Sequence, residues 1–599
     1  MRILVCVKWV PILAKLRFDP ETRRLVRAGV PGEVSAFDLR ALGCALALRA
    51  EHGGEVAVLT MGGPDAAGGL RECLALGADR GVHLMDAALV GSDTLATARA
   101  LAGAVRREAP DLVLLGRTSV DAETGQVGPE LAELLDWPQA TQARRLAVDP
   151  AGTFEAERET DEGFETVAGP LPAVVTAAED LAEERFPSKA DREAARDKPI
   201  ATITLADVGV SADAVGQAGS PTWVAGVEEV AVERRGEVLA GAGPEALARA
   251  LAERLRALGA FAAASAGAPL PAATAAPPGA PLWVVAEFGS DGPRSVTREL
   301  LAKARELAVL LGGAVEAVVI GDGPEHADAL AAAGAERVLI AAAPGLSPYT
   351  TEAHTSVLAE LVRARAPRLV LLGATVRGRD LAPRVAARLG LGLTGDAVDL
   401  DVDGDGRIRQ MKPAFGGTIV APVLSSTRPE MATVRAGMLR AASPDPARRA
   451  PLEHLDVGAV SSRVRVVRSD PAGEDVAAAL DAAPLVLGIG AGLGQDGVAQ
   501  VRALATRLGA ALATTRDVTD AGWLPRQHQV GLTGRAIAPR LYVALAIRGA
   551  MEHMVGVRRA GLVVAVNSSP KAPIRKQADL VLEADARVLL PYLEDALRP

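Results

Sequence analysis

Aromatic residues and cysteine are scarce in this sequence, and basic residues are outnumbered by acidic ones. Aromatic residues make up only 3% of the 599 residues, which argues against a nucleic-acid surface that stacks bases on side-chain rings. The formal net charge of −9 argues the same way, because binding to phosphates needs a basic face. The three cysteines, Cys6, Cys44 and Cys73, have no close pairing, so they indicate neither a disulfide framework nor a thiolate metal site and fit a reducing compartment.

Long apolar runs are missing as well. No stretch reaches the ~18 uninterrupted apolar residues that a membrane-spanning helix needs. Residues 1–11 are too briefly apolar for a signal peptide, and Lys8 interrupts them, so they predict a first β-strand. The seven histidines have no metal-binding spacing, and neither a nucleophilic Ser/His/Asp or Cys/His set nor a P-loop is present. We expect a cytoplasmic protein without a membrane span, a nucleic-acid partner, a metal site or a catalytic triad.

A long internal repeat is the main feature that is present. LVLLG begins at Leu112 and again at Leu369, and GADRGVHL at Gly77 matches GAERVLIA at Gly334. Both pairs are separated by 257 residues. A repeat this long indicates a duplicated domain, because solenoid units run to only about 20–50 residues.

Short β-branched runs alternate with longer Ala/Leu-rich amphipathic stretches, which is the pattern of a parallel α/β sheet. In the first copy, strands are expected from Ile3, Glu55, Gly81 and Asp111, with helices near 39–50, 66–76 and 94–108. The second copy repeats this pattern from Leu282. A third section after about Ser461 opens with a strand, a glycine-rich turn and a helix, and predicts another small doubly wound unit.

An Ala/Pro/Gly tract with almost no charge lies between the two copies, from Ala262 to Pro281. This composition cannot build a core and predicts an extended linker. Its position just before the second copy suggests two polypeptides fused head to tail. The predicted division is residues 1–260 with a nucleotide site and a C-terminal arm, a linker at 261–281, residues 282–460 and residues 461–599.

Two glycine-rich segments stand between a predicted strand and a helix, where backbone N–H groups can hold phosphate. Gly488–Gly494 (GIGAGLG) is a weak signal, because βα turns without a ligand have the same pattern. The segment that contains Gly125 and Gly128 is more informative, since the second copy keeps the helix but lacks these glycines. This difference between the copies favours a ligand in the first copy.

Asp401, Asp403 and Asp405, with Gly406, in DLDVDGDGR resemble the start of a calcium-binding loop whose first position is Asp401. The twelfth position of such a loop needs a bidentate carboxylate, and Lys412 stands there instead. We therefore predict a hairpin with a DG turn.

Residues 514–585 resemble the FAD domain of the electron transfer flavoprotein α subunit, through DAGWLP, QVG-TG, APRLY and VN--P-API in family order. Residues 282–440 resemble the N-terminal domain of the same subunit, including STRPEMATVRAG from Ser426. Residues 1–200 resemble the β subunit, through VCVK, LALGADR and TGQVGPELAELLDWPQ. The resemblance implies a β subunit fused ahead of an α subunit, a pseudo-heterodimer in one chain. It also implies an α/β fold with two related adenine-nucleotide-hydrolase-like domains and a doubly wound FAD-binding domain.

The resemblance implies FAD as cofactor in the third domain. The residues that match the family's FAD site are Gly490, Gly492, Thr515, Arg516, Gln529, Val530, Gly531, Leu532, Thr533, Arg548, Gly549, Ala550, Met551, Glu552, His553, Asn567 and Asp585. By the same correspondence, Arg516 would lie over the isoalloxazine, Thr533 would hydrogen-bond N5 and His553 would face the pyrimidine carbonyl. Two family residues are replaced here, an arginine by Ala491 and a glutamine by Leu532.

The resemblance also implies a second nucleotide in the β half, either AMP or, as in electron-bifurcating members, a second FAD. The matching residues are Cys6, Ser35, Phe37, Asp38, Met61, Asp121, Thr124, Gly125, Gln126, Val127 and Gly128. TGQVGP is similar to the small-residue loop of the bifurcating branch. Ser-Ala-Phe at 35–37 replaces the usual Asn-Pro-Phe, and both ligands stay open.

A member of this family carries electrons from a flavoprotein dehydrogenase to an acceptor such as a quinone oxidoreductase, as in fatty acid β-oxidation. Lys189 stands where mitochondrial-type carriers place a leucine anchor, and a charge there argues against an acyl-CoA dehydrogenase partner. Docking implies that the FAD domain swivels on segments near 440–461 and beyond Pro281. Two alternatives stay open: a bifurcating NADH-oxidising flavoprotein with two FAD, and a non-redox adenine-nucleotide-binding protein.

Overall fold

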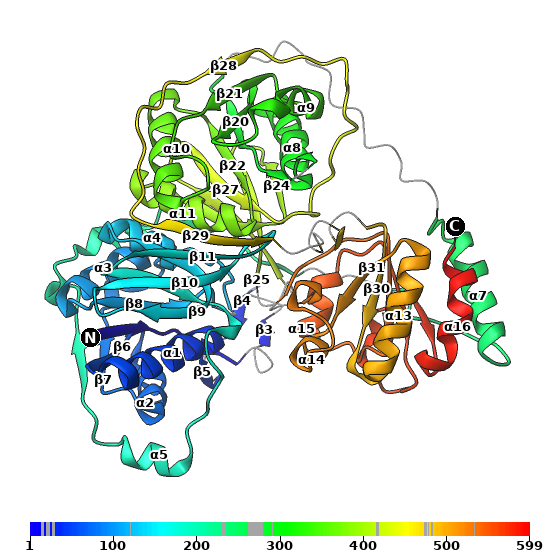
Figure 1. Ribbon diagram of the computed structural model, residues 1–599, viewed down its shortest axis with the longest axis horizontal. Helices are drawn as coiled ribbons and strands as arrows, with labels where there is room; N and C mark the ends of the chain where they lie inside the picture. Colours follow the sequence, from blue (N-terminus) through cyan, green and yellow to red (C-terminus); the bar gives the residue numbers. More distant parts are fainter. Residues whose placement is uncertain are drawn as a thin grey trace.

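The computed structural model has three α/β units (Figure 1). It describes residues 1–12, 17–19, 24–26, 30–119, 121–229, 234–261, 279–289, 291–414, 419–471, 476, 479–480, 483–531 and 534–598. The predicted linker lies almost entirely outside the described residues. No helix within these ranges is both long and apolar enough to cross a membrane, and no cluster of three or more His, Cys, Asp or Glu side chains within them is placed to bind a metal.

The first unit is built on a mostly parallel sheet. Its strands, in spatial order, are β13 (Ile200–Ile203), β7 (Arg80–Leu84), β6 (Glu55–Met61), β1 (Arg2–Cys6), β8 (Leu112–Gly116), β12 (Ala173–Ala177), β9 (Gln139–Val148), β10 (Thr153–Glu159), β11 (Gly163–Pro170) and β29 (Arg465–Pro471). Helices α1 (Ala36–His52) and α2 (Ala67–Leu76) share one apolar core with this sheet. Helices α3 (Thr94–Glu108) and α4 (Val127–Leu135) share the core on the other face. The predicted strands and helices of the first copy are confirmed.

The second unit repeats this arrangement. Its sheet has the order β23 (Leu393–Ala397), β27 (Glu430–Val434), β22 (Leu369–Gly373), β17 (Leu282–Val285), β20 (Val315–Ile320), β21 (Arg337–Ala341) and β28 (Leu452–His454). Helices α8 (Ser295–Leu311) and α9 (Ala327–Ala333) cover one face, and α10 (Thr351–Arg365) and α11 (Val376–Leu389) cover the other. Helices α3 and α10 start 257 residues apart, as do β8 and β22, so the repeat seen in the sequence is a repeat in the fold.

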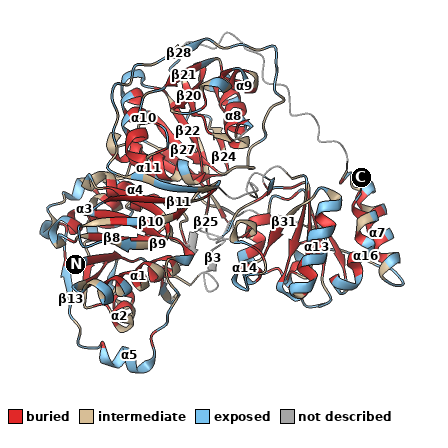
Figure 2. Cartoon of the chain, viewed as in Figure 1, coloured by how far each residue is buried: buried red, intermediate tan, exposed pale blue. Residues whose placement is uncertain are grey.

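The third unit is a parallel six-stranded sheet, and Figure 2 shows that the buried residues of all three units concentrate in their strands. Its order is β16 (Glu237–Leu239), β34 (Leu580–Leu582), β33 (Leu562–Val566), β32 (Leu541–Leu545), β30 (Leu485–Ile489) and β31 (Ala511–Thr514). Its helices are α7 (Pro244–Ala257), α13 (Gly494–Leu508), α14 (Arg516–Asp520), α15 (Met551–Met554) and α16 (Ala586–Leu597). Since β30 to β34 are wound in both directions from β30, the predicted doubly wound fold is confirmed.

Segments are exchanged between the units, and the predicted division did not include these exchanges. Strand β16 pairs with β34, and α7 packs against α16 (Figure 1), so an arm of the first half completes the third unit. Arg234 anchors this arm, because it forms a buried ion pair with Asp579 at 2.8 Å. In return, β29 joins the first sheet beside β11. The two halves are therefore interlaced as well as joined.

Part of the predicted hinge near 440–461 is held in place. Strand β28 lies inside this range and pairs with β21 of the second unit. Leu455 N donates to the carbonyl of Ile340 at 2.8 Å, and Arg463, just beyond the range, binds Glu352. This part of the range therefore belongs to the second unit, and the swivel of the FAD domain stays a prediction.

The predicted DG hairpin is confirmed. Strands β24 (Asp399–Val402) and β25 (Ile408–Ala414) pair antiparallel, and Gly406 takes the φ of +75° that the turn needs. Strand β25 continues to β26 (Ile419–Ser425), on which β14 (Thr222–Val224) and β15 (Glu228–Glu229) of the first half also pair. The remaining short elements are β2 (Trp9–Pro11), β3 (Arg17–Asp19), β4 (Arg24–Val26), β5 (Gly32–Val34), β18 (Phe288–Gly289), β19 (Gly292–Pro293), α5 (Lys189–Ala194) and α6 (Gly216–Gly219).

A buried polar network joins the first two units where the equivalent helices α4 and α11 pack together. Its centre is Asp380 of α11, whose side chain is fully buried. Five side chains donate to this carboxylate: Gln139, Thr141 and Arg158 of the first unit, and Tyr349 and Thr351 of the second. Burial alone would raise the pKa of Asp380, but Arg158 and the hydroxyl donors outweigh it and the pKa lies below its ordinary value.

Candidate functional site

The carboxyl edge of the third sheet gathers the residues predicted to bind FAD. Strands β31 and β32 lie on opposite sides of β30, and ligands of doubly wound folds bind at such a switch point, outside the carboxyl ends of the strands. Each of five strands is followed by some of these residues. Strand β30 is followed by Gly490 and Gly492, β31 by Thr515 and Arg516, β33 by Asn567 and β34 by Asp585. Strand β32 is followed by the largest group: Arg548, Gly549, Ala550, Met551, Glu552 and His553. Gln529 and Val530 extend this edge, since Val530 N donates to the carbonyl of Thr514.

The glycine-rich turn after β30 is shaped by close packing. A Cβ on Gly488 would lie 1.9 Å from the hydroxyl oxygen of Tyr542, and a Cβ on Gly490 would lie 2.2 Å from the carbonyl oxygen of Ala546. Gly494 has φ +69°. Each of these glycines has a structural reason that needs no ligand, although the turn does present its backbone at the switch point.

Some polar side chains at this edge already have hydrogen-bond or ion-pair partners within the protein. Asn567 donates to the carbonyl of Ile547 at 2.8 Å, and Asp585 accepts from Arg587 N and begins α16. Arg516 pairs with Asp520 at 3.1 Å and is 43% exposed. Thr515 differs, because its hydroxyl is buried and has no hydrogen-bond partner among the described residues. Such a hydroxyl can receive a polar ligand atom. Leu532 and Thr533 lie outside the described residues.

His553 has both ring nitrogens engaged inside the protein. Its Nδ1 lies 2.9 Å from the carbonyl oxygen of Val530, and its Nε2 lies 2.8 Å from the hydroxyl of Tyr542. Burial lowers the pKa of His553 to about 4, only partly offset by the bond to Val530. Gly531 allows its segment to pass close to helix α15, since a Cβ at position 531 would lie 2.3 Å from the carbonyl oxygen of Glu552.

The residues predicted for a second nucleotide form two groups in the first unit. In one group, Asp38 ties three elements together: it accepts from Lys8 N and from Gly116 N, both at 2.8 Å. Lys8 Nζ in turn pairs with Asp121 at 2.8 Å. Cys6 lies nearby, and burial followed by the charge of Asp38 raises the pKa of its thiol to about 12. Ser35 begins α1, and its buried hydroxyl has no partner among the described residues.

The second group, Thr124 to Gly128, faces the second unit. Gln126 accepts from the hydroxyl of Thr94 at 2.8 Å and donates to the carbonyl of Leu393 at 3.3 Å. Gly128 is required by packing, since a Cβ there would lie 2.5 Å from a methyl group of Thr176. Val127 and Met61 pack on the apolar core, and Phe37 lies under the guanidinium of Arg117. The loop therefore also serves as an interface between the two copies.

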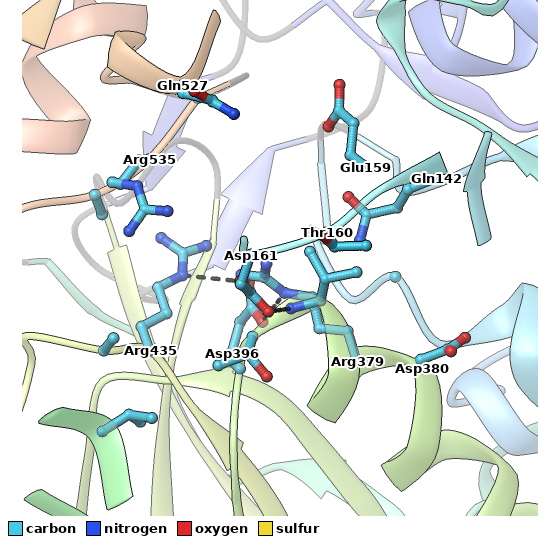
Figure 3. A pocket seen from close by; sticks show the side chains of 18 of the residues that line it. Gln142, Glu159, Thr160, Asp161, Arg379, Asp380, Asp396, Arg435, Gln527 and Arg535 are labelled. Carbon is cyan, nitrogen blue, oxygen red and sulfur yellow. Dashed lines mark hydrogen bonds and ion pairs between the residues drawn. The ribbon is translucent and has the colours of Figure 1, made fainter. Parts of the chain in front are cut away.

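A cavity of about 720 Å³ lies where the three units meet. Its lining includes Thr124 and Gly125 of the predicted second site, and Gln529 and Gly531 of the predicted FAD site. In Figure 3, Arg535 and Gln527 enter it from the third unit, opposite Arg435 of the second. Two loops that we predicted for different ligands thus open into one space.

The cavity wall carries a compensated charge cluster around Asp396. Arg379 donates to this carboxylate at 2.9 and 3.0 Å, and Arg435 at 3.3 Å. Arg435 also donates to Glu123 of the first unit at 2.9 Å. Burial alone would raise the pKa of Asp396, but the cations hold it far below its ordinary value. Burial lowers the pKa of the neighbouring Lys412 to about 8. Among the described lining residues, arginines and carboxylates are equal in number, seven of each.

Comparison with known families assigns the units. The family model described as the electron transfer flavoprotein domain matches residues 22–208 and 282–460, the two copies of the repeat. The model described as the electron transfer flavoprotein FAD-binding domain matches residues 479–558 of the third unit. The chain belongs to the electron transfer flavoprotein family.

Relatives of this electron transfer flavoprotein match either half. The α subunit from Thermoanaerobacterium thermosaccharolyticum is 37% identical over 321 residues, which is 53% of this chain and 97% of the relative. Protein FixB from Clostridium saccharobutylicum is 36% identical over 317 residues, 52% of this chain and 94% of the relative. The β subunit from T. thermosaccharolyticum is 39% identical over 256 residues, which is 43% of this chain and 98% of the relative. The chain is a β subunit fused to an α subunit, as predicted.

Sequence reasoning missed several residues that the structure brings to these edges. Lys8 and Arg435 lie within two of the motifs that carried the resemblance, VCVK and STRPEMATVRAG, so motif membership was an available signal. Tyr542 lies in a third such motif, APRLY, but in the buried strand LYVAL it has the pattern of a core residue.

Proposed function

We propose that this electron transfer flavoprotein carries electrons one at a time from a flavoprotein dehydrogenase to a redox acceptor such as a quinone oxidoreductase. FAD at the carboxyl edge of the third sheet would supply the one-electron steps. The observation that supports this most directly is the FAD-binding family match over 479–558, on a doubly wound sheet whose carboxyl edge gathers the predicted residues.

The residues present at this edge fit the cofactor. The buried hydroxyl of Thr515 provides a hydrogen-bonding group that no other described residue uses. The turn at Gly490 and the start of α13 offer backbone N–H groups at the switch point. Arg516 would supply positive charge there, in spite of its pair with Asp520. Ala491 supplies no cation.

The shared cavity fits the ring end of the cofactor better than its phosphates. Its volume of about 720 Å³ lies within the ~300–1,000 Å³ range of ligand sites. Its seven arginines are balanced by seven carboxylates, so the net field suits an uncharged polar ring. We propose that Gln529 and Gly531 line this end of the FAD site.

For the first unit we propose a second nucleotide, AMP or FAD, near Ser35 and Asp121. The buried hydroxyl of Ser35, which has no partner in the described part of the chain, supports a ligand here. Lys8 supplies a cation at the same strand ends. Binding of two FAD would favour the bifurcating alternative.

For the electron donor, we propose docking on the projecting segment around α5. Lys189 begins α5, and Phe186 before it is 76% exposed. A charged residue at position 189 would exclude a partner with an apolar pocket there, so we expect a dehydrogenase other than an acyl-CoA dehydrogenase of the mitochondrial type.

The decisive experiment is the absorbance spectrum and nucleotide content of the purified protein. One FAD and one AMP per chain, with stepwise one-electron reduction, would support the carrier. Two FAD and reduction by NADH would support the bifurcating enzyme instead. A protein that stays colourless after reconstitution with FAD would overturn both and leave the non-redox nucleotide-binding alternative.

The FAD site is tested separately by Thr515→Val, which removes only the unpartnered hydroxyl. Loss of one hydrogen bond of about 0.5–1.5 kcal/mol lowers FAD affinity roughly 2- to 10-fold. Thr506→Val is the matched control, because that hydroxyl bonds the carbonyl of Arg502 within α13. Equal FAD affinity in both variants would place the cofactor elsewhere.

A further inference from the structure

Tyr542 and His553 form a buried pair beneath the carboxyl edge of the third sheet. Tyr542 lies in β32 and is fully buried, and His553 lies in α15 and is 5% exposed. The Tyr542 hydroxyl is 2.8 Å from Nε2 of His553, and the Val530 carbonyl oxygen is 2.9 Å from Nδ1. Only His553 of this pair is among the predicted FAD residues.

The partners of the ring determine where its proton lies. A backbone carbonyl can only accept, so Nδ1 of His553 carries a hydrogen and donates it to Val530. In the neutral ring Nε2 then carries no hydrogen and accepts a hydrogen bond from the Tyr542 hydroxyl. A doubly protonated ring would leave that hydroxyl proton without an acceptor among the described residues. An unsatisfied buried donor is costly.

The fold makes specific room for this hydroxyl. A Cβ at position 488 would lie 1.9 Å from the Tyr542 hydroxyl oxygen, so β30 carries a glycine where the tyrosine passes. Burial lowers the pKa of His553 and raises that of Tyr542, so the fold favours the uncharged form of both. Among the described residues, the groups that bond the ring are the Tyr542 hydroxyl and the Val530 carbonyl, and neither is charged.

We propose that Tyr542 is a positioning residue of the cofactor domain: by donating to Nε2 it holds His553 as an uncharged ring in one orientation. This rests on the proposed function, in which His553 belongs to the FAD site. His553 then provides no cation and no Nε2 proton to the cofactor. Positive charge near the cofactor then comes from arginine, with Arg516 and Arg548 as candidates on this edge.

The test is an NMR titration of histidine-labelled, FAD-free protein, with the His553 signal assigned from His553→Gln. In the wild type we expect a neutral ring protonated at Nδ1 across ~pH 5.5–8. In Tyr542→Phe, Nε2 loses its donor, so the proton affinity of the ring should rise by up to about tenfold, one pKa unit. The midpoint potential of bound FAD should then differ from the wild type in its pH dependence at acidic pH, where the ring of the variant takes up a proton. Tyr592→Phe, on the partly exposed face of α16, is the matched control.

Two results would overturn the proposal. One is a wild-type ring that is protonated at Nε2, which is visible even if Tyr542→Phe fails to fold. The other is a folded Tyr542→Phe variant with an unchanged His553 titration, since a purely structural tyrosine would lower stability only. FAD reconstitution of the same wild-type sample tests the proposed function independently, because the titration needs no cofactor.

Discussion

Replacing Asp380 by asparagine should weaken the contact between the first and second units. The carboxylate is fully buried and accepts from five side chains, three of them in the first unit. Asparagine keeps the shape but removes the charge, and its amide group adds hydrogens where the site already supplies donors. The variant leaves Arg158 buried beside a neutral group.

The magnitude follows from the burial of the pair. Removing one partner of a buried ion pair costs about 3–5 kcal/mol, because the other charge is left uncompensated. Arg158 keeps a second partner, Glu165, at 2.6 Å, which favours the lower end of this range. Since each 1.4 kcal/mol is tenfold in an equilibrium constant, the halves should bind about 100- to 3,000-fold more weakly.

The assay needs halves that can separate. A protease site placed within 262–278 would allow cleavage of the linker, and exchange of a fluorescently labelled second half would report dissociation. Most of the change should appear in the dissociation rate, as is usual for interface substitutions. The single variant Arg158→Met and the double variant Arg158→Met/Asp380→Asn complete a cycle, in which the double should cost less than the sum of the singles.

Asp403→Asn is the control, because Asp403 pairs with Arg407 in an exposed hairpin and its loss should leave exchange unchanged. An Asp380→Asn protein that exchanges within about threefold of the wild type would refute the reasoning, since a buried pair cannot be broken at so small a cost. Additive costs in the cycle would show that Asp380 and Arg158 do not act together.

Three further predictions follow from single features. Cleavage within 262–278 should leave the halves co-eluting in size-exclusion chromatography, because exchanged strands hold them; separation of the wild-type halves would contradict this. Burial keeps the pKa of Glu130 well above 4.5, so the stability of the wild type should fall as the pH rises above 4.5. In Glu130→Gln, urea unfolding midpoints should lack this fall. Parallel plots of the urea midpoint against pH for the two proteins would contradict the prediction. Gly490→Ala places a Cβ 2.2 Å from the Ala546 carbonyl oxygen and should lower thermal stability and FAD content, whereas Gly404→Ala, with open space around it, should not.

Much of the fold could be predicted because its signals are local. Strand β8 and strand β22 are the same five residues, LVLLG, and a run of buried aliphatic residues before a helix specifies a parallel strand wherever it occurs. The hairpin at Asp403–Gly406 was predictable for the same reason, since a DG turn needs only its own residues.

The exchanged strands could not be predicted because strand pairing is a long-range choice. Strand β16 is only three residues long, and nothing in Glu237–Leu239 specifies that its partner is Leu580–Leu582. Strand β29 has two adjacent valines followed by four residues without an aliphatic side chain, RVVRSDP, so it lacks the alternation that marks a strand. In both cases hydrogen bonds to a preformed sheet edge decide the structure.

The site was predictable at the level of strand ends and not at the level of side-chain partners. Residues after parallel strands must share an edge, so Thr515 and Asn567 were placed together by topology alone. Whether a polar group there is free or occupied depends on side chains from distant segments. Asn567 donates to the carbonyl of Ile547, whereas the Thr515 hydroxyl has no partner within the described ranges. No local pattern distinguishes the two residues.

The exchanged segments determine what a swivelling FAD domain has to carry with it. Because β16 and α7 are part of the third unit, any rotation of that unit moves the arm of the first half as well. Arginine side chains join the third unit to the other two. Arg526 pairs with Asp180 of the first unit at 3.2 Å, and Arg559 donates to the carbonyl of Met438 of the second unit at 2.7 Å. Both bonds must break if the unit turns. The 17 residues at 262–278 can reach up to about 60 Å, so the fusion adds a tether whose length need not prevent the rotation. In the proposed carrier, the fusion therefore keeps the two subunits at equal stoichiometry while their relative motion depends on the same interfaces as in separate chains.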